Sequence, residues 1–233
     1  MGDFADKLTA DIKDLFGEWS IRDGRKIPEQ DDLGYGKDGT KIDATILYAD
    51  LVDSTGLAVG YKAWFAAAVS KTFLLSAVRI IRNNTGTIAS FDGDRVMAIF
   101  LGDSQDSNAA IAALQINYAV TQIIQPYLKD RFPTTKYVPR HCVGIDRSAV
   151  TAVRAGIRGN NDLIWIGRAA NYAAILSEIR SDHATYITQD VYALLNAKAK
   201  LKNGEGENKW TKTSVSFKGR SVDCYKSNYW KSV

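Results

Sequence analysis

Two acidic residues at the ends of predicted strands give the sequence its clearest chemical signal. Asp50 ends the apolar segment IDATILYAD, and Asp94 opens the second strand of a predicted hairpin. Two carboxylates without a neighbouring histidine suit Mg²⁺ or Mn²⁺, which proteins hold through one or two carboxylates and substrate phosphates. Two such ions about 3.5–4 Å apart activate an attacking oxygen and stabilise a leaving one. The pair predicts a two-metal site if the fold brings both strands together, whereas either aspartate alone would be an ordinary cap or turn residue.

The segment VDST lies directly after Asp50 and before the first long predicted helix. Backbone N–H groups at the start of a helix bind phosphate oxygens, and serine and threonine are also common N-cap residues there. Both roles can hold at once. The segment therefore predicts a phosphate-binding turn, which consists of Val52, Asp53, Ser54 and Thr55.

The composition is that of a globular chain of 233 residues, a length that predicts one domain with or without an appendage. Apolar residues make up 45% and charged residues 24%, which is enough material for a core. The net charge of +4 is too small to indicate a polyanion-binding protein, so no nucleic-acid partner is expected. Cys142 and Cys224 form no C-x-x-C, and His141 and His183 lie far apart. These positions argue against a disulfide framework, a zinc finger and a histidine metal site.

The sequence shows no sign of membrane insertion or secretion. The longest apolar run, Ala63 to Val69, is far shorter than the ~18 residues of a membrane span. Acidic residues interrupt the N-terminal region where a secretion signal would be apolar. We therefore expect a cytoplasmic protein without a membrane partner.

The N-terminal part differs from the rest of the chain in its pattern of apolar and polar residues. Apolar residues recur at helical spacing over residues 3–16, which predicts a short amphipathic helix. Residues 20–41 are polar, with four glycines and a proline, and predict a linker or an arm. Either this part is a disordered lead-in, or its helix packs on its own domain or on a second subunit. We therefore divide the chain into an N-terminal helix and linker (1–41) and a main domain (42–233).

From residue 42 onward, strand and helix patterns alternate. The pattern predicts, in order, a strand (42–50), a helix (60–83), a hairpin (87–91 and 94–100) turning at Asp92-Gly93, a helix (104–128), strands (140–146, 149–157 and 163–166), a helix (167–180), a strand (184–188), a mobile polar loop (197–208) and a closing hairpin (214–219 and 221–226). The order β-α-β-β-α-β is the ferredoxin-like split βαβ arrangement of the α+β class. We expect an antiparallel-rich sheet with helices on one face and a homodimer partner covering the other.

Four segments resemble the catalytic domain of the class III nucleotidyl cyclases. They are LYADLVDST (47–55), SFDGDRVMAIF (90–100), VGID (143–146) and IWIGRAANYAAIL (164–176). The resemblance covers about residues 42–226 and identifies the main domain as the catalytic one. In its small stand-alone form, the chain is most similar to the pyrimidine (uridylate or cytidylate) cyclases of bacterial Pycsar antiphage defence.

The resemblance implies a role for each matching residue. Asp50 and Asp94 would hold two Mg²⁺ or Mn²⁺ ions per active site, with the backbone carbonyl of Leu51 as a further ligand. The VDST turn would cradle the β- and γ-phosphates. Asn171 would orient the ribose and Lys218 would reach the triphosphate, each from the partner subunit of a homodimer.

Two basic positions leave alternatives open. Lys218 lies on the turn of a closing hairpin, where a lysine is otherwise simply solvated, and it is preferred only slightly to Arg220. The family's transition-state arginine falls on Ile175 here, although the charge that develops on the α-phosphate still requires a cation. Arg168 shares a helix face with Asn171 and is our candidate substitute. Otherwise Arg168 is a surface residue, and the role of the arginine has moved elsewhere or been lost.

The base-pocket positions also depart from the family's purine cyclases. Adenylate cyclases have a lysine and an aspartate where this chain has Ser90 and Ile164, and Ile164 fits the guanylate scheme no better. A site without these groups does not favour ATP or GTP. Tyr48 lies two residues before Asp50 on the same sheet face, where its ring either narrows the pocket to a single-ring base or packs in the dimer interface. Ser90 is a second candidate contact, and UTP is favoured over CTP only through the resemblance.

The combined hypothesis is a homodimeric, metal-dependent cyclase that forms a 3′,5′-cyclic pyrimidine monophosphate and diphosphate from UTP (or CTP). Its product would signal to a separate cyclic-nucleotide-binding effector during antiviral defence. One alternative is a divergent adenylate or guanylate cyclase, and another is a non-catalytic nucleotide-sensing dimerisation module, which Ile175 favours. A polymerase palm could also use paired acids, but it would require a strongly basic groove.

Overall fold

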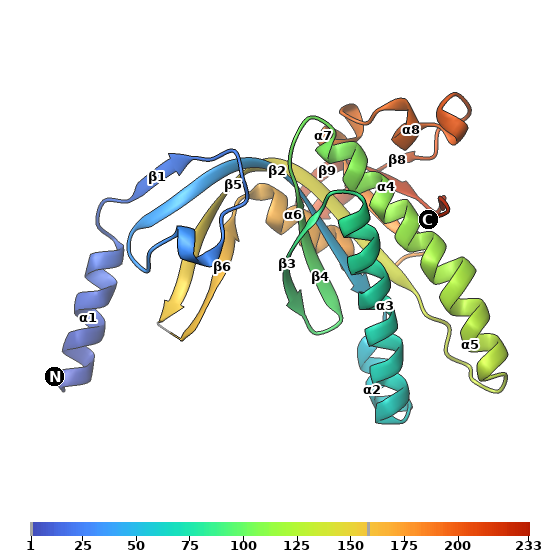
Figure 1. The fold of residues 1–233 in the computed structure, drawn as a ribbon, viewed down its shortest axis with the longest axis horizontal. Helices are drawn as coiled ribbons and strands as arrows, with labels where there is room; N and C mark the ends of the chain where they lie inside the picture. Colours follow the sequence, from blue (N-terminus) through green and yellow to red (C-terminus); the bar gives the residue numbers. More distant parts are fainter. Residues whose placement is uncertain (1, 158) are drawn as a thin grey trace. The chain divides into compact units, whose positions relative to one another are not determined.

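The structure is a computed structural model that describes residues 2–157 and 159–233 (Figure 1). The chain divides into two compact units. The first contains Met1–Asp43 and Ala149–Gly167, and the second contains Ala44–Ser148 and Arg168–Val233. Strands β2 (Asp38–Leu51) and β5 (His141–Ile157) each contribute residues to both units.

In the first unit, helix α1 (Asp3–Leu15) confirms the amphipathic helix predicted for residues 3–16. The linker predicted for residues 20–41 is wrong in part, because this segment contains strand β1 (Ser20–Asp23), the 3-10 helix η1 (Gln30–Asp32) and the start of β2. All four residues of β1 are exposed. The strand is stabilised by parallel backbone pairing with β2, which leaves no apolar pattern in the sequence.

The other half of the first unit is a hairpin formed by the end of β5 and by β6 (Asn160–Ile166). The N-terminal segment is attached to this hairpin through Arg154. Its guanidinium lies 4.2 Å from the ring centre of Tyr35 and donates to the carbonyl oxygen of Leu33 at 3.2 Å. Leu33 and Tyr35, just before β2, are thus packed against the hairpin, whereas no residue of α1 is buried.

The second unit contains the predicted split βαβ sheet. Its strand order is β3-β4-β2-β5-β7-β9-β8. Of the pairs with a defined register, β5 with β7 is parallel and the others are antiparallel. The additional strands are β3 (Thr87–Asp92), β4 (Arg95–Phe100), β7 (Thr185–Thr188), β8 (Thr211–Phe217) and β9 (Arg220–Ser227). The predicted strands 140–146 and 149–157 form the single strand β5.

The predicted β3–β4 turn is displaced by one residue. Asp92 pairs with Arg95, so the two turn residues are Gly93 and Asp94 rather than Asp92 and Gly93. Gly93 adopts a φ of +61°, a left-handed conformation that glycine reaches without steric cost. Asp94 therefore lies on the turn itself and not on the strand.

One face of this sheet is covered by α2 (Ser54–Gly60), α3 (Ala63–Asn83), α4 (Gln105–Tyr118), a π-helical turn (Ala119–Ile124) and α5 (Gln125–Arg131) (Figure 1). The last three form the single helix predicted for 104–128. Helix α3 is long and apolar enough, by length and composition alone, to cross a membrane. It buries Phe65, Val69, Phe73 and Ala77 against the sheet at helical spacing, as a core helix does.

Helix α6 (Arg168–Ser177) covers the opposite face, so the prediction of helices on one face is wrong. Along β5, Val143 faces the α3–α4 core, whereas Cys142 contacts the carbonyl oxygen of Leu176 in α6 at 3.3 Å. At Gly144, an added Cβ would lie 2.1 Å from the carbonyl oxygen of Ala173. Because glycine has no side chain, α6 can lie directly on the strand at Gly144. Strand and helix order alone does not determine which face a helix covers.

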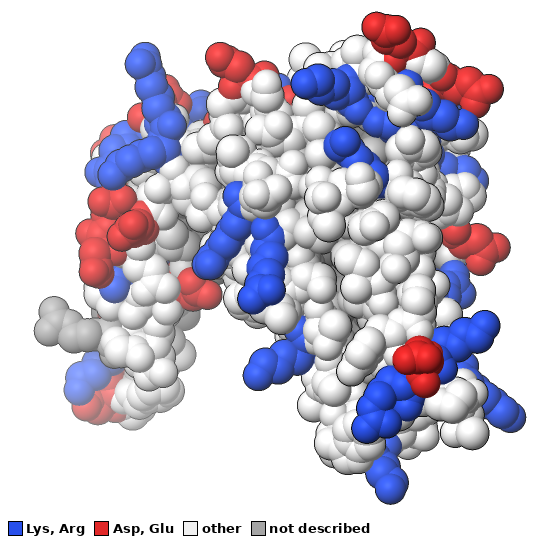
Figure 2. All heavy atoms as spheres, turned by 45° about the vertical axis from the view of Figure 1, so that its right-hand side comes forward, with Lys and Arg blue, Asp and Glu red and all other residues white. Residues whose placement is uncertain are grey.

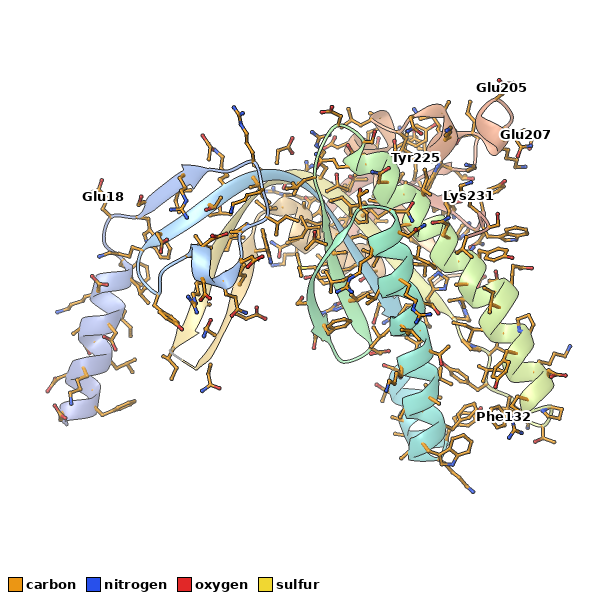
Figure 3. The ribbon with its side chains drawn as sticks, in the orientation of Figure 1. Glu18, Phe132, Glu205, Glu207, Tyr225 and Lys231 are labelled. Carbon is orange, nitrogen blue, oxygen red and sulfur yellow. The ribbon has the colours of Figure 1, made fainter. Side chains whose placement is uncertain are left out.

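The segment 197–208, predicted to be a mobile polar loop, is structured instead. It contains α8 (Ala197–Lys200) and the 3-10 helix η3 (Lys202–Gly204), and it follows α7 (Gln189–Ala193). Ala199 is fully buried, and its carbonyl oxygen accepts a hydrogen bond from the indole of Trp210 at 3.0 Å. Figure 3 shows Glu205 and Glu207 pointing outward beyond η3. The polar side chains that suggested mobility face solvent, while a contact with Trp210 orders the backbone.

Candidate active site

Asp50 and Asp94 lie at the same end of neighbouring strands. Strand β2 pairs antiparallel with β4, with Ala49 opposite Val96, so the end of β2 reaches the β3–β4 turn that carries Asp94. Burial raises the pKa of the Asp50 carboxyl above its usual value, and the nearby charge of Asp94 raises it further. The two carboxylates are therefore close enough to interact, as the sequence predicted.

The two carboxylates differ in their partners. Asp50 is 8% exposed, and its Oδ2 accepts a hydrogen bond from Nη2 of Arg180 at 2.9 Å, which opposes the effect of burial on its pKa. Oδ2 of Asp94 is buried and has no hydrogen-bond partner. A buried carboxylate oxygen without a partner is costly, and a cation would satisfy it.

This donor set fits a divalent ion that prefers oxygen. No cluster of three or more histidine, cysteine, aspartate or glutamate residues that could hold a metal occurs in residues 2–157 and 159–233. A metal at the Asp50–Asp94 pair would thus take its other ligands from carbonyl groups, water or phosphate, which is the usual coordination of Mg²⁺. The carbonyl of Leu51, the last residue of β2, stays a predicted ligand.

At Val52 the structure does not agree with the phosphate-binding role predicted for the VDST turn. The N–H of Val52 donates to the carbonyl oxygen of Arg140 at 2.8 Å, so this group extends strand pairing and is not a free phosphate donor. Asp53 adopts a left-handed φ of +61° and caps α2 by accepting from the N–H of Gly56 at 3.2 Å. Ser54 and Thr55 follow within the first turn of α2, and their contact with phosphate stays a prediction.

Tyr48 and Ser90 lie on the same sheet face as Asp50. Met97 of β4 pairs with Tyr48 on one side and with Ser90 on the other, and directly paired residues project from one face. Leu47 and Ala49, which alternate with Tyr48, belong to the core on the other face. Two of the predicted base-pocket residues, Tyr48 and Ser90, therefore share the face that carries Asp50.

Arg95 adds a cation to this face. Its guanidinium carbon lies 5.2 Å from the ring centre of Tyr48, and it donates to Glu178 at 2.6 Å and to Asp92 at 2.9 Å. Burial raises the pKa of the Tyr48 hydroxyl, while the charge of Arg95 lowers it. Arg95 directly follows Asp94 within the hairpin motif, and that position was the one signal in the sequence that could have identified it.

Ile164 lies on β6 in the first unit, opposite Val153, with 45% of its surface exposed. An exposed isoleucine offers no hydrogen bond to a base. Its place as a base-pocket position stays a prediction.

Arg168 is bound by two carboxylates of its own chain, and its role at the α-phosphate stays a prediction. Its guanidinium donates to both oxygens of Asp146, at 3.1 and 3.3 Å, to Asp190 at 2.5 Å and to the carbonyl oxygen of Arg147 at 2.7 Å. The side chain of Asp146 has no exposed surface. Arg168 therefore neutralises a buried charge and fixes the start of α6.

Asn171 and Ile175 lie one turn apart on α6, and both are exposed. Lys218 is exposed at the β8–β9 turn with a φ of +46°, and the adjacent Phe217 stacks on Tyr172 of α6 at 4.4 Å between ring centres. The roles of Asn171 and Lys218 across a dimer interface stay predictions.

Sequence reasoning missed Arg180, which contacts Asp50 across 130 positions of sequence. It follows α6 outside the family motif, so no local signal marked it. On the face visible in Figure 2, lysine and arginine side chains form several separate groups with acidic side chains between them.

No family model matches the chain. Proteins named uridylate cyclase are close relatives. The protein from Xanthomonas perforans is 42% identical over 226 residues, covering 96% of both chains. The protein from Burkholderia cepacia is 47% identical over 204 residues, covering 86% of this chain and 88% of the relative.

The fold agrees with solved cyclase structures. The adenylyl cyclase CyaB from P. aeruginosa has a TM-score of 0.65 and 21% identity, covering 81% of this chain and 95% of that one. The guanylyl cyclase Cya2 has a TM-score of 0.68 and 15% identity, covering 83% and 95%. The relatives of 42% and 47% identity, with which this fold agrees, show that the chain belongs to the class III nucleotidyl cyclases.

Proposed function

We propose that the protein is a uridylate cyclase that converts UTP into 3′,5′-cyclic UMP and diphosphate with two divalent ions. The relatives of 42% and 47% identity carry that name. The observation that carries the proposal is the convergence of Asp50 and Asp94 at one sheet end, where Oδ2 of Asp94 is buried without a partner.

The reaction requires the 3′-hydroxyl of the ribose to attack the α-phosphorus of the same nucleotide. The new O–P bond forms as the hydroxyl loses its proton to water, and diphosphate leaves with the electron pair of the broken P–O bond. Bound Mg²⁺ or Mn²⁺ would supply activation of the attacking oxygen and stabilisation of the leaving one. Asp50 and Asp94 would hold the ions, and the start of α2 with Ser54 and Thr55 would position the outer phosphates.

The choice of base would depend on Tyr48, Ser90 and Arg95. The Tyr48 ring would occupy the space that the second ring of a purine needs. The guanidinium carbon of Arg95 lies 5.2 Å from the centre of the tyrosine ring. Arg95 also bonds Glu178 and Asp92. A guanidinium only donates hydrogen bonds, so a remaining N–H of Arg95 would pair with O4 of uracil and not with the amino group of cytosine. This chemistry favours UTP over CTP, which remains the second candidate substrate.

A homodimer would complete each site. Asn171 and Lys218 are exposed, and neither residue is part of the Asp50–Asp94 pair of its own chain. In a two-fold dimer they would serve the partner's nucleotide, Asn171 at the ribose and Lys218 at the triphosphate. The cytoplasmic location, the antiphage role and a separate effector that binds cyclic UMP are supported by the family resemblance alone.

The test is to incubate the purified protein with UTP, CTP, ATP and GTP separately, with Mn²⁺, and to identify the products by mass spectrometry. We expect cyclic UMP as the main product. Cyclic AMP or cyclic GMP as the main product would favour the divergent purine cyclase. The absence of any cyclic product would favour a nucleotide-sensing module.

A further inference from the structure

The guanidinium of Arg180 is hydrogen-bonded to the carboxylate of Asp50. The proposed reaction needs that carboxylate to hold its metal ions. Its Nη2 donates to Oδ2 of Asp50 at 2.9 Å, and its Nη1 donates to the carbonyl oxygen of Ser177 at 3.2 Å. The Arg180 side chain is 48% exposed, whereas that of Asp50 is 11% exposed. Part of the Arg180 side chain therefore remains accessible beside the acidic pair.

Two other arginines of this region, Arg168 and Arg95, each bind two carboxylates. Arg168 lies between Asp146 and Asp190, and Arg95 lies between Asp92 and Glu178. Removing either would leave two carboxylates without their cation. Within residues 2–157 and 159–233, Arg180 has a single carboxylate partner, Asp50.

Asp50, the single carboxylate partner of Arg180 among the described residues, is also the group that divalent ions would bind. A doubly charged ion on Asp50 competes with the guanidinium for the same oxygen and repels it. The triphosphate held by such ions would then be the nearest source of negative charge. Since Ile175 brings no charge where the family has its transition-state arginine, the reacting phosphate still requires a cation.

We propose that Arg180 is a further catalytic residue, which pairs with Asp50 in the absence of divalent ions and binds the non-bridging oxygens of the α-phosphate once ions and nucleotide are bound. This inference rests on the proposed function. In the cyclisation step the bond between the 3′-oxygen and the α-phosphorus forms, and the bond from that phosphorus to diphosphate breaks. The 3′-proton passes to water. Arg180 donates hydrogen bonds to the developing charge and neither gains nor loses a proton.

The first test measures Mn²⁺ binding without nucleotide, by electron paramagnetic resonance of the free ion. The variants are Arg180→Gln, which removes the charge, and Arg180→Lys, which keeps it. Arg140→Gln is the matched control, because this half-exposed arginine bonds Ser181 and Asp182 rather than Asp50. We expect Arg180→Gln to bind Mn²⁺ about two- to fivefold more tightly, as removal of a half-exposed ion pair predicts. Unchanged or weaker binding would contradict the competition.

The second test measures the single-turnover rate of cyclic UMP formation at saturating Mn²⁺ and UTP. Arg180→Gln should lower the rate by about 10²–10³-fold, as loss of one transition-state donor does. Arg180→Lys should recover part of the rate, and Arg140→Gln should retain it. An unchanged rate in a folded Arg180→Gln variant would overturn the catalytic role.

The two measurements separate this inference from the proposed function. If the unsubstituted protein forms no cyclic nucleotide from any triphosphate, the proposed function fails, and the catalytic role of Arg180 fails with it. The Mn²⁺ titration then still decides whether Arg180 and the ion compete for Asp50. If the unsubstituted protein is active and Arg180→Gln equals it, only the inference about Arg180 is wrong.

Discussion

Arg168 at the start of α6 and Asp146 on β5 form a two-point ion pair. Nε and Nη2 of the arginine lie 3.1 and 3.3 Å from the two carboxylate oxygens. Thr188 donates a third hydrogen bond to Asp146 at 2.6 Å. Burial raises the pKa of the Asp146 carboxyl, and the hydroxyl of Thr188 and the charge of Arg168 oppose it. The pair therefore attaches α6 to the sheet.

Replacement of Arg168 by alanine should destabilise the protein. The variant leaves a fully buried carboxylate without its cation, and we expect a loss of about 2–4 kcal/mol in the free energy of unfolding. Denaturant unfolding measures this loss. The double variant Arg168→Ala/Asp146→Asn removes the buried charge as well and should recover much of it. Normal stability of Arg168→Ala, combined with loss of activity, would contradict this structural role and favour the catalytic role predicted from the sequence.

Asp50→Asn and Asp94→Asn should each abolish product formation while the protein stays folded. Asparagine keeps the size of the side chain but lacks the charge that holds Mg²⁺ or Mn²⁺. We expect turnover of UTP to fall by at least about 10³-fold, since both actions of the metal pair are lost. Product analysis and circular dichroism together measure this outcome. Full activity of either folded variant would remove the two-metal scheme.

Tyr48→Ala should loosen the choice of base. The smaller side chain opens space beside Arg95 for the second ring of a purine, so the ratio of UTP to ATP turnover should fall by at least about tenfold. Tyr48→Phe, which keeps the ring and removes the hydroxyl, separates shape from hydrogen bonding. The measurement is kcat/KM for each triphosphate. An unchanged ranking of the four nucleotides in Tyr48→Ala would exclude Tyr48 from the pocket.

Mixing two inactive variants should restore activity if each site combines residues of two subunits. Each proposed site takes Asp50 from one subunit and Asn171 from the other. In a mixed dimer, the Asn171→Ala subunit supplies an intact Asp50 and the Asp50→Asn subunit supplies an intact Asn171, so one site remains complete. Equal mixing should give about a quarter of the unsubstituted activity, because half of the dimers are mixed and each has one working site. The measurement is UTP turnover after unfolding and refolding the mixture. Activity no higher than that of the separate variants would argue against shared sites.

Stability should fall between about pH 6.5 and pH 4 because of His141. Burial lowers the pKa of this histidine from 6.5 to about 4, and its Nε2 is buried without a partner. The unfolded chain therefore binds a proton in this range before the folded protein does. The stabilisation is complete above pH 6.5 and is lost as the pH falls, by about 3 kcal/mol in total.

The variant His141→Leu tests this dependence, since leucine has no titrating group and replaces an imidazole that packs 6.0 Å from the ring of Phe73. Its unfolding free energy should decrease less between pH 7 and pH 4 than that of the unsubstituted protein. His183 provides the control, because it is more accessible and His183→Leu should leave most of the acid dependence in place. Equal slopes for the His141→Leu variant and the unsubstituted protein would show that other groups cause the loss.

Local patterns in the sequence were sufficient for much of the fold and for the acidic pair. The helical spacing of Phe65, Val69 and Phe73 predicted α3, and the Asp-Gly turn predicted the β3–β4 hairpin to within one residue. The same hairpin, placed beside β2 by the split βαβ order, brought Asp94 to Asp50. These features depend on neighbours within one turn or one strand pair, where side-chain periodicity carries the information.

Other features were decided only by the tertiary structure, because they depend on contacts between distant segments. Strand β1 is stabilised by backbone pairing that no side chain encodes. The face covered by α6 follows from a close approach at Gly144, and the segment after α7 is ordered by Trp210. The same applies to the arginines. The sequence marks Arg168 by its place in the family motif and does not mark Arg180, and only the folded chain places one on the buried Asp146 and the other on Asp50. Sequence determines which charges the chain carries, but the partner of each charge is set by packing over long separations in the chain.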